Sequence, residues 1–415
     1  MARLLVDLSP LRESREYRLL YIGQTVSYMG RQLTIVGIPL QVFELTHHSS
    51  LQVGLVSLTA LGPLLLTSLF LGPVIDAVDR RRLLLVTQVV MASTSAGLAV
   101  NALQHRPAVW PLYLLSAIAG GISGVDGPTS SAILATLVRR EQLAASAALS
   151  QIMYQLAGSV GPGLAGLLID QAGLATAYLV DVSTFSVMFG CVALMRPLPP
   201  AGGGTPLGLR SVREGLTYLR RDRVLQSTFF IDLDAMIFGM PRALFPAIAI
   251  DRFHGGAGVL GLLVGAPGAG ALVGATFTGW VTRVRRQGLA VVLAVIAWGL
   301  AIVAFGLVPS LPLALLFLAV AGAADVISAV FRNTMLQTLV PDALRGRLTA
   351  IHIAVVTGGP RLGDAEAGAV AALTSTEVSV VSGGIACILG VLVLLRAVPA
   401  LVGYEAQDAP VIDVD

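Results

Sequence analysis

Charged side chains inside long apolar stretches are the residues of this sequence best placed to do chemistry. They include Arg31, Asp126, Asp181, Asp234, Arg242, Asp325 and Arg332. Because a charge at the centre of a bilayer-spanning helix costs roughly 2.5–3.5 kcal/mol, such residues face a water-filled cavity or pair with one another. A carboxylate whose surroundings change between desolvated and charge-paired also changes its affinity for protons. The pattern predicts proton coupling at a central cavity.

Asp126 is the first candidate for the proton carrier, because it lies in the middle of an apolar stretch among small residues that would leave it open to a cavity. Two alternatives remain for it. One is a structural ion pair with Arg31, and the other is a bystander position on the cavity wall. Asp181 could serve in coupling or in structure.

Two further acid–base pairs have helical spacing. Asp234 and Arg242 are eight residues apart, and Asp325 and Arg332 are seven apart. Either spacing is about two turns, which places both members roughly on one face of an α-helix. The sequence predicts these residues as cavity charges or as partners in pairs between helices.

The elements that must position these residues are membrane-spanning helices. Of the 415 residues, 55% are hydrophobic and only 12% are charged, whereas a soluble domain carries about 25% charged residues. The 45 glycines and 21 prolines agree with a membrane protein, whose helices tolerate both residue types. The composition therefore indicates an all-α integral membrane protein.

Twelve apolar runs are long enough to cross a bilayer, which takes about 20 residues as a helix. They cover residues 17–45, 51–76, 83–104, 109–138, 143–169, 173–196, 224–250, 257–282, 288–308, 312–339, 347–372 and 377–398. The predicted domains are a six-helix bundle over 1–196, a linker over 197–223, a second six-helix bundle over 224–398 and a tail over 399–415. Within the linker, Leu209–Arg221 has the pattern of an amphipathic helix on a membrane surface.

The arginines indicate an orientation. All 27 basic residues are arginine, and most fall in loops on one side of the predicted helices, whereas Arg106 and Arg252 fall on the other. The positive-inside rule then places both termini and the linker in the cytoplasm. The expected location is the cytoplasmic membrane of a bacterium, with the lipid bilayer as a partner. The pI of about 9.1 reflects these loops and does not indicate nucleic acid.

An internal repeat relates the two halves of the chain. Matching positions are Gly72 with Gly279, Pro39 with Pro246, and Pro162 with Pro360, separated by 207, 207 and 198 residues. Transporters built from two parallel repeats bind their substrates between the repeats near mid-bilayer. The repeat therefore predicts a central site between the two halves of the chain.

The loop between the second and third runs resembles the loop signature of the major facilitator superfamily. The matching residues are Gly72, Asp76, Arg80, Arg81 and Arg82, while Ala77 replaces a basic residue and Asp79 replaces a glycine. The resemblance implies a twelve-helix fold of two pseudo-symmetric bundles, with the substrate site at the interface of spans 1, 4, 7 and 10. It also implies a charge latch between the halves, the alternative being that these arginines only anchor the loop at the membrane surface.

The fifth run resembles the glycine–proline signature of drug:proton antiporters. Its matching residues are Gly158, Gly161, Pro162 and Gly166. Two further stretches, Leu8–Val56 and Asn333–Thr338, resemble the enterobactin exporter branch of the superfamily. The basic residue that many drug:proton exporters carry in the fourth run is absent, and Asp126 stands in that run instead. The resemblance implies export of a siderophore or a drug against protons.

Polar and aromatic side chains within the spans supply candidate contacts for such a substrate. They are Gln24, Tyr28, Gln151, Tyr154, Gln155, Asn333 and Gln337. Each has hydrogen-bonding groups that a polar ligand could use, although about half of them would be expected simply to satisfy neighbouring helices.

Enzyme, metal and cofactor motifs are absent from the sequence. It has no phosphate-binding G-x-x-x-x-G-K-[ST] loop, no G-x-S-x-G nucleophile turn and no histidine-rich ligand cluster. We therefore expect no catalytic residues, no metal and no cofactor. The resemblance implies a proton-coupled exporter of an amphipathic small molecule, with a monomer as the usual state of the family. The alternatives are a proton-coupled nutrient importer and a non-transporting membrane sensor on the same fold.

Overall fold

The computed structural model describes residues 7–71, 77–198, 209–276 and 284–405. In this part of the chain the regular structure is helical throughout, with no β-strand. The positions Gly72 and Asp76 of the loop signature, and Gly279 of the repeat, lie outside the described residues. The predicted all-helical membrane fold is confirmed.

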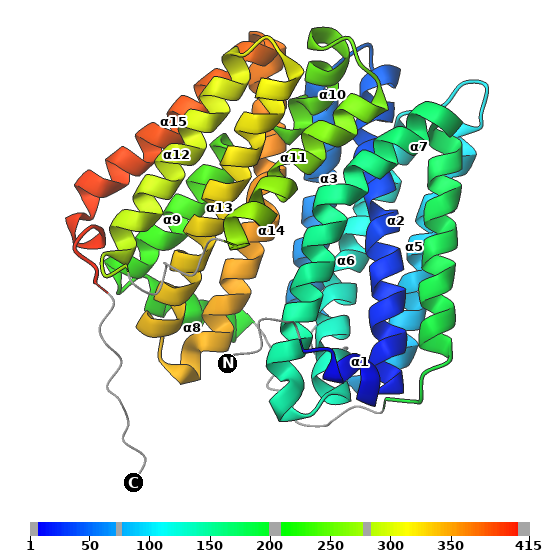
Figure 1. Cartoon of the computed structure of the whole chain (residues 1–415), viewed down its shortest axis with the longest axis horizontal. Coiled ribbons are helices and arrows are strands. Elements are labelled where there is room, and N and C mark those ends of the chain that lie inside the picture. The colour runs from blue at the N-terminus through cyan, green and yellow to red at the C-terminus, as the bar shows by residue number, and fades with distance from the viewer. Residues whose placement is uncertain (1–6, 72–76, 199–208, 277–283, 406–415) are drawn as a thin grey trace.

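The first bundle contains the elements α1 to α7 (Figure 1). Their bounds are α1 Ser9–Glu13, α2 Arg15–Leu45, α3 Ser50–Phe70, α5 Arg80–Ala102, α6 Trp110–Leu137, η1 Arg140–Gln142 and α7 Leu143–Ala193. Gly173 divides α7 into two segments, because its φ of 81° and ψ of 166° are not helical and suit a residue without a Cβ. The predicted runs 143–169 and 173–196 are therefore two crossings within one element.

The second bundle contains α9 to α15, preceded by the linker helix α8 (Figure 1). The bounds are α8 Leu209–Leu219, α9 Arg223–Phe238, η2 Arg242–Leu244, α10 Phe245–Ala247, η3 Ile248–Arg252, α11 Ala257–Thr276, α12 Gln287–Leu307, α13 Leu311–Leu339, α14 Asp342–Leu373, α15 Thr376–Ala397 and η5 Pro399–Leu401. The seventh predicted run is thus one helix followed by three short turns.

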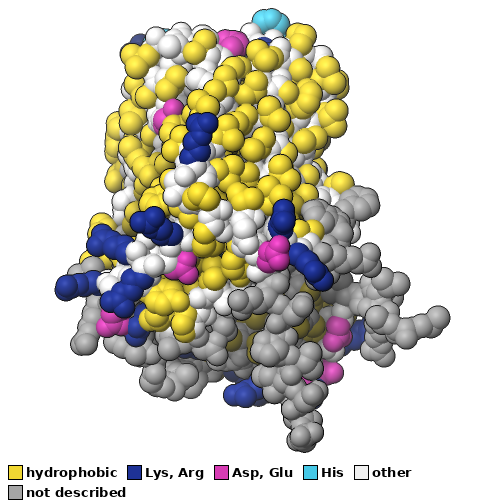
Figure 2. Space-filling view, turned by 90° about the vertical axis from the view of Figure 1, so that its left-hand side faces the viewer, with side chains coloured by type: hydrophobic (Ala, Val, Ile, Leu, Met, Phe, Trp, Pro, Cys, Tyr) yellow, Lys and Arg dark blue, Asp and Glu magenta, His cyan; other side chains and the backbone are white. Residues whose placement is uncertain are grey.

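The outer wall of the molecule suits a bilayer. Hydrophobic side chains cover most of the face in Figure 2, and arginines gather toward its lower end. Eight segments of the described residues are long and apolar enough to span a membrane, one of them containing all of α7. The helices α2, α6 and α14 fall outside that group, and two of these carry Arg31 and Asp126. In α6 the single charged residue is Asp126.

Two ends of the molecule can be distinguished by their arginines. The arginine-rich end carries α1, α8 and Arg80–Arg82, and the arginine-poor end carries the α2–α3 turn and Arg252. Helix α8 packs against the arginine-rich ends of α13 and α14. Its Glu214 pairs with Arg347 of α14 at 2.5 Å, and the Tyr218 hydroxyl donates to the carbonyl oxygen of Leu339 at 3.0 Å.

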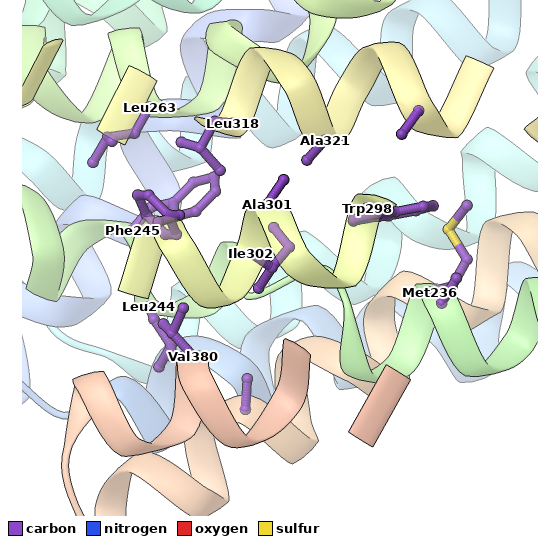
Figure 3. Packing of buried hydrophobic residues seen from close by; sticks show 14 of the residues in the cluster. Met236, Leu244, Phe245, Leu263, Trp298, Ala301, Ile302, Leu318, Ala321 and Val380 are labelled. Carbon is purple, nitrogen blue, oxygen red and sulfur yellow. The ribbon is translucent and has the colours of Figure 1, made fainter. Parts of the chain in front are cut away.

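The core of the second bundle is built around α12. In Figure 3, Trp298 and Ile302 of this helix lie among side chains of α9, α10 and α13. Helix α9 ends at Phe238, because Pro241 cannot donate a helical hydrogen bond. The Trp298 indole N–H donates to the freed carbonyl oxygen of Gly239 at 2.8 Å. This contact satisfies a buried polar group at the break.

The bundles share their apolar core at one end and separate toward the other. A continuous buried cluster combines Ile169 of α7 with Leu260 of α11, near the arginine-poor end. At the arginine-rich end, the first bundle has its own cluster around Leu84 and the second has its own around Leu348. The ribbons of the two bundles diverge in the same direction (Figure 1).

Candidate functional site

Arg31 and Asp126 form an ion pair inside the first bundle. The closest atoms, Nη2 of Arg31 on α2 and Oδ2 of Asp126 on α6, are 3.5 Å apart. The Asp126 side chain is buried, whereas 25% of the Arg31 side chain is exposed. The pairing that the sequence offered as one alternative for Asp126 is therefore present. It does not exclude coupling, because a partly exposed partner can also contact a ligand.

Helix α5 supplies two more partners to Asp126. Thr87 donates its hydroxyl to Oδ1 at 2.8 Å, and Gln88 donates its amide to the same oxygen at 2.8 Å. Both donors are buried. Two donors therefore occupy Oδ1 of Asp126, while its Oδ2 faces Arg31.

Two tyrosines cover the Arg31–Asp126 pair. The guanidinium carbon of Arg31 lies 5.1 Å from the ring centre of Tyr28. The Tyr28 hydroxyl is hydrogen-bonded to the Tyr154 hydroxyl at 2.9 Å, and the two rings meet edge to face at 4.6 Å. Since 44% of Tyr154 is exposed, this aromatic group is open to a ligand on one side.

Asp181 belongs to the interior of the first bundle. It is fully buried and accepts a hydrogen bond from Ser95 of α5 at 2.6 Å. Thr184 on the next turn donates to its other oxygen at 3.3 Å. Of the two roles that the sequence left open for Asp181, this setting favours the structural one.

The second bundle contains a larger charge cluster. Arg332 of α13 pairs with Asp232 of α9 at 2.8 Å and with Asp325 of its own helix at 3.8 Å. His352 of α14 approaches the other oxygen of Asp232 at 3.7 Å. Asp232 is fully buried, while 28% of the Asp325 side chain is exposed. The seven-residue spacing of Asp325 and Arg332 thus predicted a contact that exists.

The predicted relation between Asp234 and Arg242 was wrong. The expectation assumed one continuous helix, but α9 ends at Phe238 and Arg242 begins the separate turn η2. Asp234 instead packs against Gly390 of α15, where a Cβ would overlap its carboxylate. Asp234 and Arg242 therefore do not share a helix face. Their role as cavity residues remains a prediction.

The predicted polar contacts of the substrate differ in exposure. Gln24 is buried, Tyr28 and Gln155 are partly buried, and Gln151, Tyr154, Asn333 and Gln337 are exposed. Tyr28 and Tyr154 of this set flank the Arg31–Asp126 pair. The others stay predictions of substrate contact.

The described part of the loop signature stabilises the first bundle. Asp79, which replaces a signature glycine, caps α5 by accepting from the backbone N–H groups of Arg81 and Arg82 at 2.9 and 3.3 Å. Arg81 donates from Nε to the carbonyl oxygen of Val192 at 3.0 Å, at the end of α7 where a cation is favourable. The backbone N–H of Arg80 donates to the carbonyl oxygen of Leu198 at 3.3 Å, and Nη1 of its side chain donates to that of Ala132 at 3.5 Å, both within this bundle. The latch between halves stays a prediction.

The glycine–proline segment of α7 lies against the second bundle. A Cβ on Gly166 would overlap the carbonyl oxygen of Ala257, and one on Gly261 of α11 would overlap that of Pro162. A Cβ on Gly268 would lie 2.8 Å from the carbonyl oxygen of Gly158. Gly161, in contrast, faces Gln32 of α2 within its own bundle. Small residues let helix backbones approach closely in membranes.

A second close approach lies between α3 and α14. A Cβ on Gly54 would overlap the carbonyl oxygen of Asp364, and one on Gly368 would lie 2.6 Å from the carbonyl oxygen of Ser50. We call the four glycines at these two crossings, Gly54, Gly166, Gly261 and Gly368, the interbundle seal. All four lie in the halves of their helices that are nearer the arginine-poor end.

Polar contacts join the bundles at the rim of the seal. Asp170 of α7 accepts from the N–H of Ala257 at 2.8 Å and from the N–H of Gly258 at 2.7 Å, which caps the start of α11. His48 after α2 contacts Asp251 of η3 at 2.8 Å. These contacts exist only while the two bundles are together at this end.

An opening on the arginine-rich side follows from exposure and packing together. Arg31 and Asp325, from different bundles, are each about a quarter exposed in the middle of long helices. Such charges are stable in a membrane when they face a water-filled space. Because the bundles are joined near the arginine-poor end and have separate cores near the other, we infer that this space opens toward the arginine-rich end.

Several of these residues were not singled out by their sequence pattern. Thr87, Gln88 and Asp170 carry no motif. His352 lies 198 residues after Tyr154, the same separation as Pro162 and Pro360, so the repeat could have drawn attention to it. Asp232 is one of the charges that the sequence places at membrane depth, but its pairing with Arg332 of another helix has no signal in residue spacing.

Comparisons with known proteins agree over nearly the whole chain. The family model described as transmembrane secretion effector matches residues 6–410. The enterobactin exporter EntS of Shigella boydii serotype 18 is 30% identical over 394 residues, which cover 94% of each protein. EntS of Escherichia coli O81 is 29% identical with the same coverage.

Two solved structures share the fold. The nucleoside transporter NupG superposes with a TM-score of 0.75 at 13% identity, covering 92% of this chain and 99% of that chain. A bacterial homologue of the human lysosomal transporter Spinster, described as inward-facing and unoccupied, superposes with a TM-score of 0.72 at 15% identity, covering 95% and 99%. At these identities the similarity shows the architecture of two six-helix bundles.

Proposed function

Because this chain belongs to the transmembrane secretion effector family of major facilitator transporters, we propose that it exports an amphipathic small molecule by proton antiport. It is a multi-pass bacterial membrane transporter. In the proposed orientation the arginine-rich end, with both termini and α8, faces the cytoplasm, as the positive-inside rule requires. The structure then corresponds to a state that is open to the cytoplasm.

The observation that carries this function is the arrangement around Asp126. Thr87 and Gln88 occupy Oδ1, while Oδ2 lies 3.5 Å from Arg31, longer than the 2.7–2.9 Å typical of a charge-assisted hydrogen bond. Oδ2 therefore has room for another donor. A proton and a donor group of the substrate would compete for this one oxygen, and antiport requires such mutual exclusion.

The neighbouring side chains suit an aromatic, hydroxylated substrate. Tyr154 offers an exposed ring beside Arg31 and Asp126, on which a second ring could stack. A catechol placed there would donate its hydroxyls to Asp126 and accept from Arg31. The relatives named as enterobactin exporters support a catecholate siderophore as the substrate class, ahead of a cationic drug.

Alternating access would proceed by opening the interbundle seal. The seal joins backbones through glycines, so it can separate without withdrawing large side chains from a pocket. A proton moving inward through 100 mV supplies about 2.3 kcal/mol, which is sufficient to bias an equilibrium between two states that differ by a few kcal/mol.

Secretion from living cells tests the proposed function. A bacterium that makes a catecholate siderophore but lacks its exporter should regain catecholate in the medium when it expresses this protein, and should not regain it with an empty vector. Increased tolerance of a cationic dye without any catecholate in the medium would overturn the siderophore assignment in favour of a drug exporter.

The cap that Asp170 forms on α11 should stabilise the state that is closed at the arginine-poor end. Loss of a helix cap costs about 0.5–2 kcal/mol, so Asp170→Ala is expected to shift the equilibrium toward opening at this end by about 2- to 30-fold. Spin labels at Gln171 and Ser310, in a chain whose two cysteines are replaced by serine, would report the shift as a larger population of long distances.

Glu377 provides the matched control for Asp170. It is an exposed acid in the first turn of α15, within one bundle. Glu377→Ala should leave the distance distribution unchanged. Equal shifts in both variants would mean that the Asp170 cap does not act between the bundles.

A further inference from the structure

The two bundles carry the same constellation with the charges exchanged. In the first, a cation on the first span, Arg31, pairs with an acid on the fourth, Asp126. In the second, an acid on the seventh span, Asp232, pairs with a cation on the tenth, Arg332. Since spans 1 and 4 correspond to spans 7 and 10 in the repeat, the two pairs occupy equivalent helices.

An aromatic ring that meets a second ring edge to face accompanies each ion pair, and the two bundles use different residues for it. Tyr154 meets Tyr28 at 4.6 Å and 70° in the first bundle. His352 meets Phe229 at 5.7 Å and 85° in the second. His352 follows Tyr154 by 198 residues, the repeat separation of this span. Tyrosine keeps its proton near neutral pH, whereas histidine changes its charge between pH 5 and 8.

The charges around His352 leave a place for one proton. Asp232 and Asp325 are both acids and Arg332 is the cation between them, so the three carry one net negative charge when ionised. Net charge in a membrane interior is costly. A proton on the imidazole, 3.7 Å from Asp232, would bring the cluster to neutrality.

Charged groups also lie on the other described elements packed against α14. Arg242 of η2 acts electrostatically on Asp325 and on Asp364 of α14. Helix α9 presents Asp232, and α13 presents Arg332 with Asp325 behind it. Helix α8 presents Glu214, which is already paired with Arg347. Helix α3 has no charged residue, and those of α15, Glu377 and Arg396, lie near its two ends.

We propose that His352, held by Asp232 and Arg332, is a second proton-binding site, which sets the pH dependence of this transporter. The imidazole is partly exposed, with 18% of its side chain accessible, so a proton can enter from water on the open side. Asp232 and Arg332 are positioning residues, because their mutual pair fixes the carboxylate that the imidazole approaches.

Infrared difference spectra of the purified protein in lipid nanodiscs, taken between pH 8.5 and 5.5, test the site without any substrate. The wild type should show imidazole protonation signals from its five histidines, and one component of them should be lost in His352→Gln and in His352→Tyr. The tyrosine variant introduces the residue type that the first bundle has at the equivalent position, Tyr154, and keeps an aromatic ring beside Phe229. An unchanged spectrum in both variants would overturn the assignment.

Of the two experiments, only the transport measurement rests on the proposed function. The charge of a histidine changes between pH 5 and 8. Exchange of enterobactin across proteoliposomes at equal pH on both sides should vary at least about fivefold over this range in the wild type, and less than about twofold in His352→Gln. The same profile in both proteins would overturn the regulatory role.

His105→Gln is the matched control, because His105 is an exposed histidine between α5 and α6. This variant should retain the wild-type pH profile. A failure of antiport itself is distinguishable from a failure of the site: wild-type protein without substrate-driven proton movement would contradict the proposed function, while the infrared signal would still decide whether His352 binds a proton.

Discussion

Replacing Asp126 with asparagine is expected to uncouple substrate movement from protons. The amide can still accept from Thr87 and Gln88, so the local packing is kept, but it cannot bind the transported proton. Uphill accumulation of a catecholate driven by a pH gradient should fall at least about tenfold, a loss of about 1.4 kcal/mol. Exchange of the same compound without a gradient should persist.

A second variant separates the effect on proton coupling from the effect on the stability of the protein. Asp126→Asn leaves Arg31 without its acidic partner, and an unpaired buried charge destabilises a protein. The double variant Arg31→Gln with Asp126→Asn removes both charges of the pair. It should unfold at a temperature nearer to that of the wild type and remain uncoupled. Retained uphill transport in either variant would move the proton site away from Asp126.

Adding one methyl group to the interbundle seal should prevent the bundles from closing at the arginine-poor end. The new Cβ of Gly166→Ala would overlap the Ala257 carbonyl oxygen, and overpacking of this kind costs about 1–3 kcal/mol. The closed state should lose about 5- to 150-fold in population. The label pair at Gln171 and Ser310 should then report mainly long distances, and substrate exchange should slow by at least about fivefold.

Gly163 is the internal control for the seal. It lies three residues from Gly166 on the same helix, but no side chain or neighbouring backbone atom lies within 4 Å of a Cβ built there. Gly163→Ala should keep the wild-type distances and exchange rate. Because alanine favours helix over glycine by up to about 1 kcal/mol, it should also not lower the thermal stability. Identical behaviour of both variants would contradict a steric role for the seal.

The sequence was informative wherever the signal was local or periodic. Span lengths and hydropathy predicted the all-helical fold, and the seven-residue spacing of Asp325 and Arg332 predicted their contact. The glycines and proline of the fifth run were selected by resemblance. The structure adds that Gly166 and Pro162 contact the other bundle, whereas Gly161 contacts its own.

The partners across helices could not be predicted in this way. Asp126 is held by Thr87 and Gln88, which lie about 38 residues away in sequence and meet it only because α5 packs against α6. The Asp234–Arg242 prediction failed because a single break at Gly239–Pro241 outweighed the apolar pattern of the run. Periodicity describes one helix face at a time, and a site between helices depends on the packing of several.

Substrate-driven proton movement tests the central claim most directly. Wild-type protein would be reconstituted into proteoliposomes with a pH-sensitive dye inside and no initial pH gradient, and enterobactin would be added outside. Antiport predicts that entry of the catecholate drives protons outward, so the lumen becomes alkaline in proportion to the substrate gradient. Entry of enterobactin with no change of luminal pH, beyond that of protein-free liposomes, would contradict proton antiport.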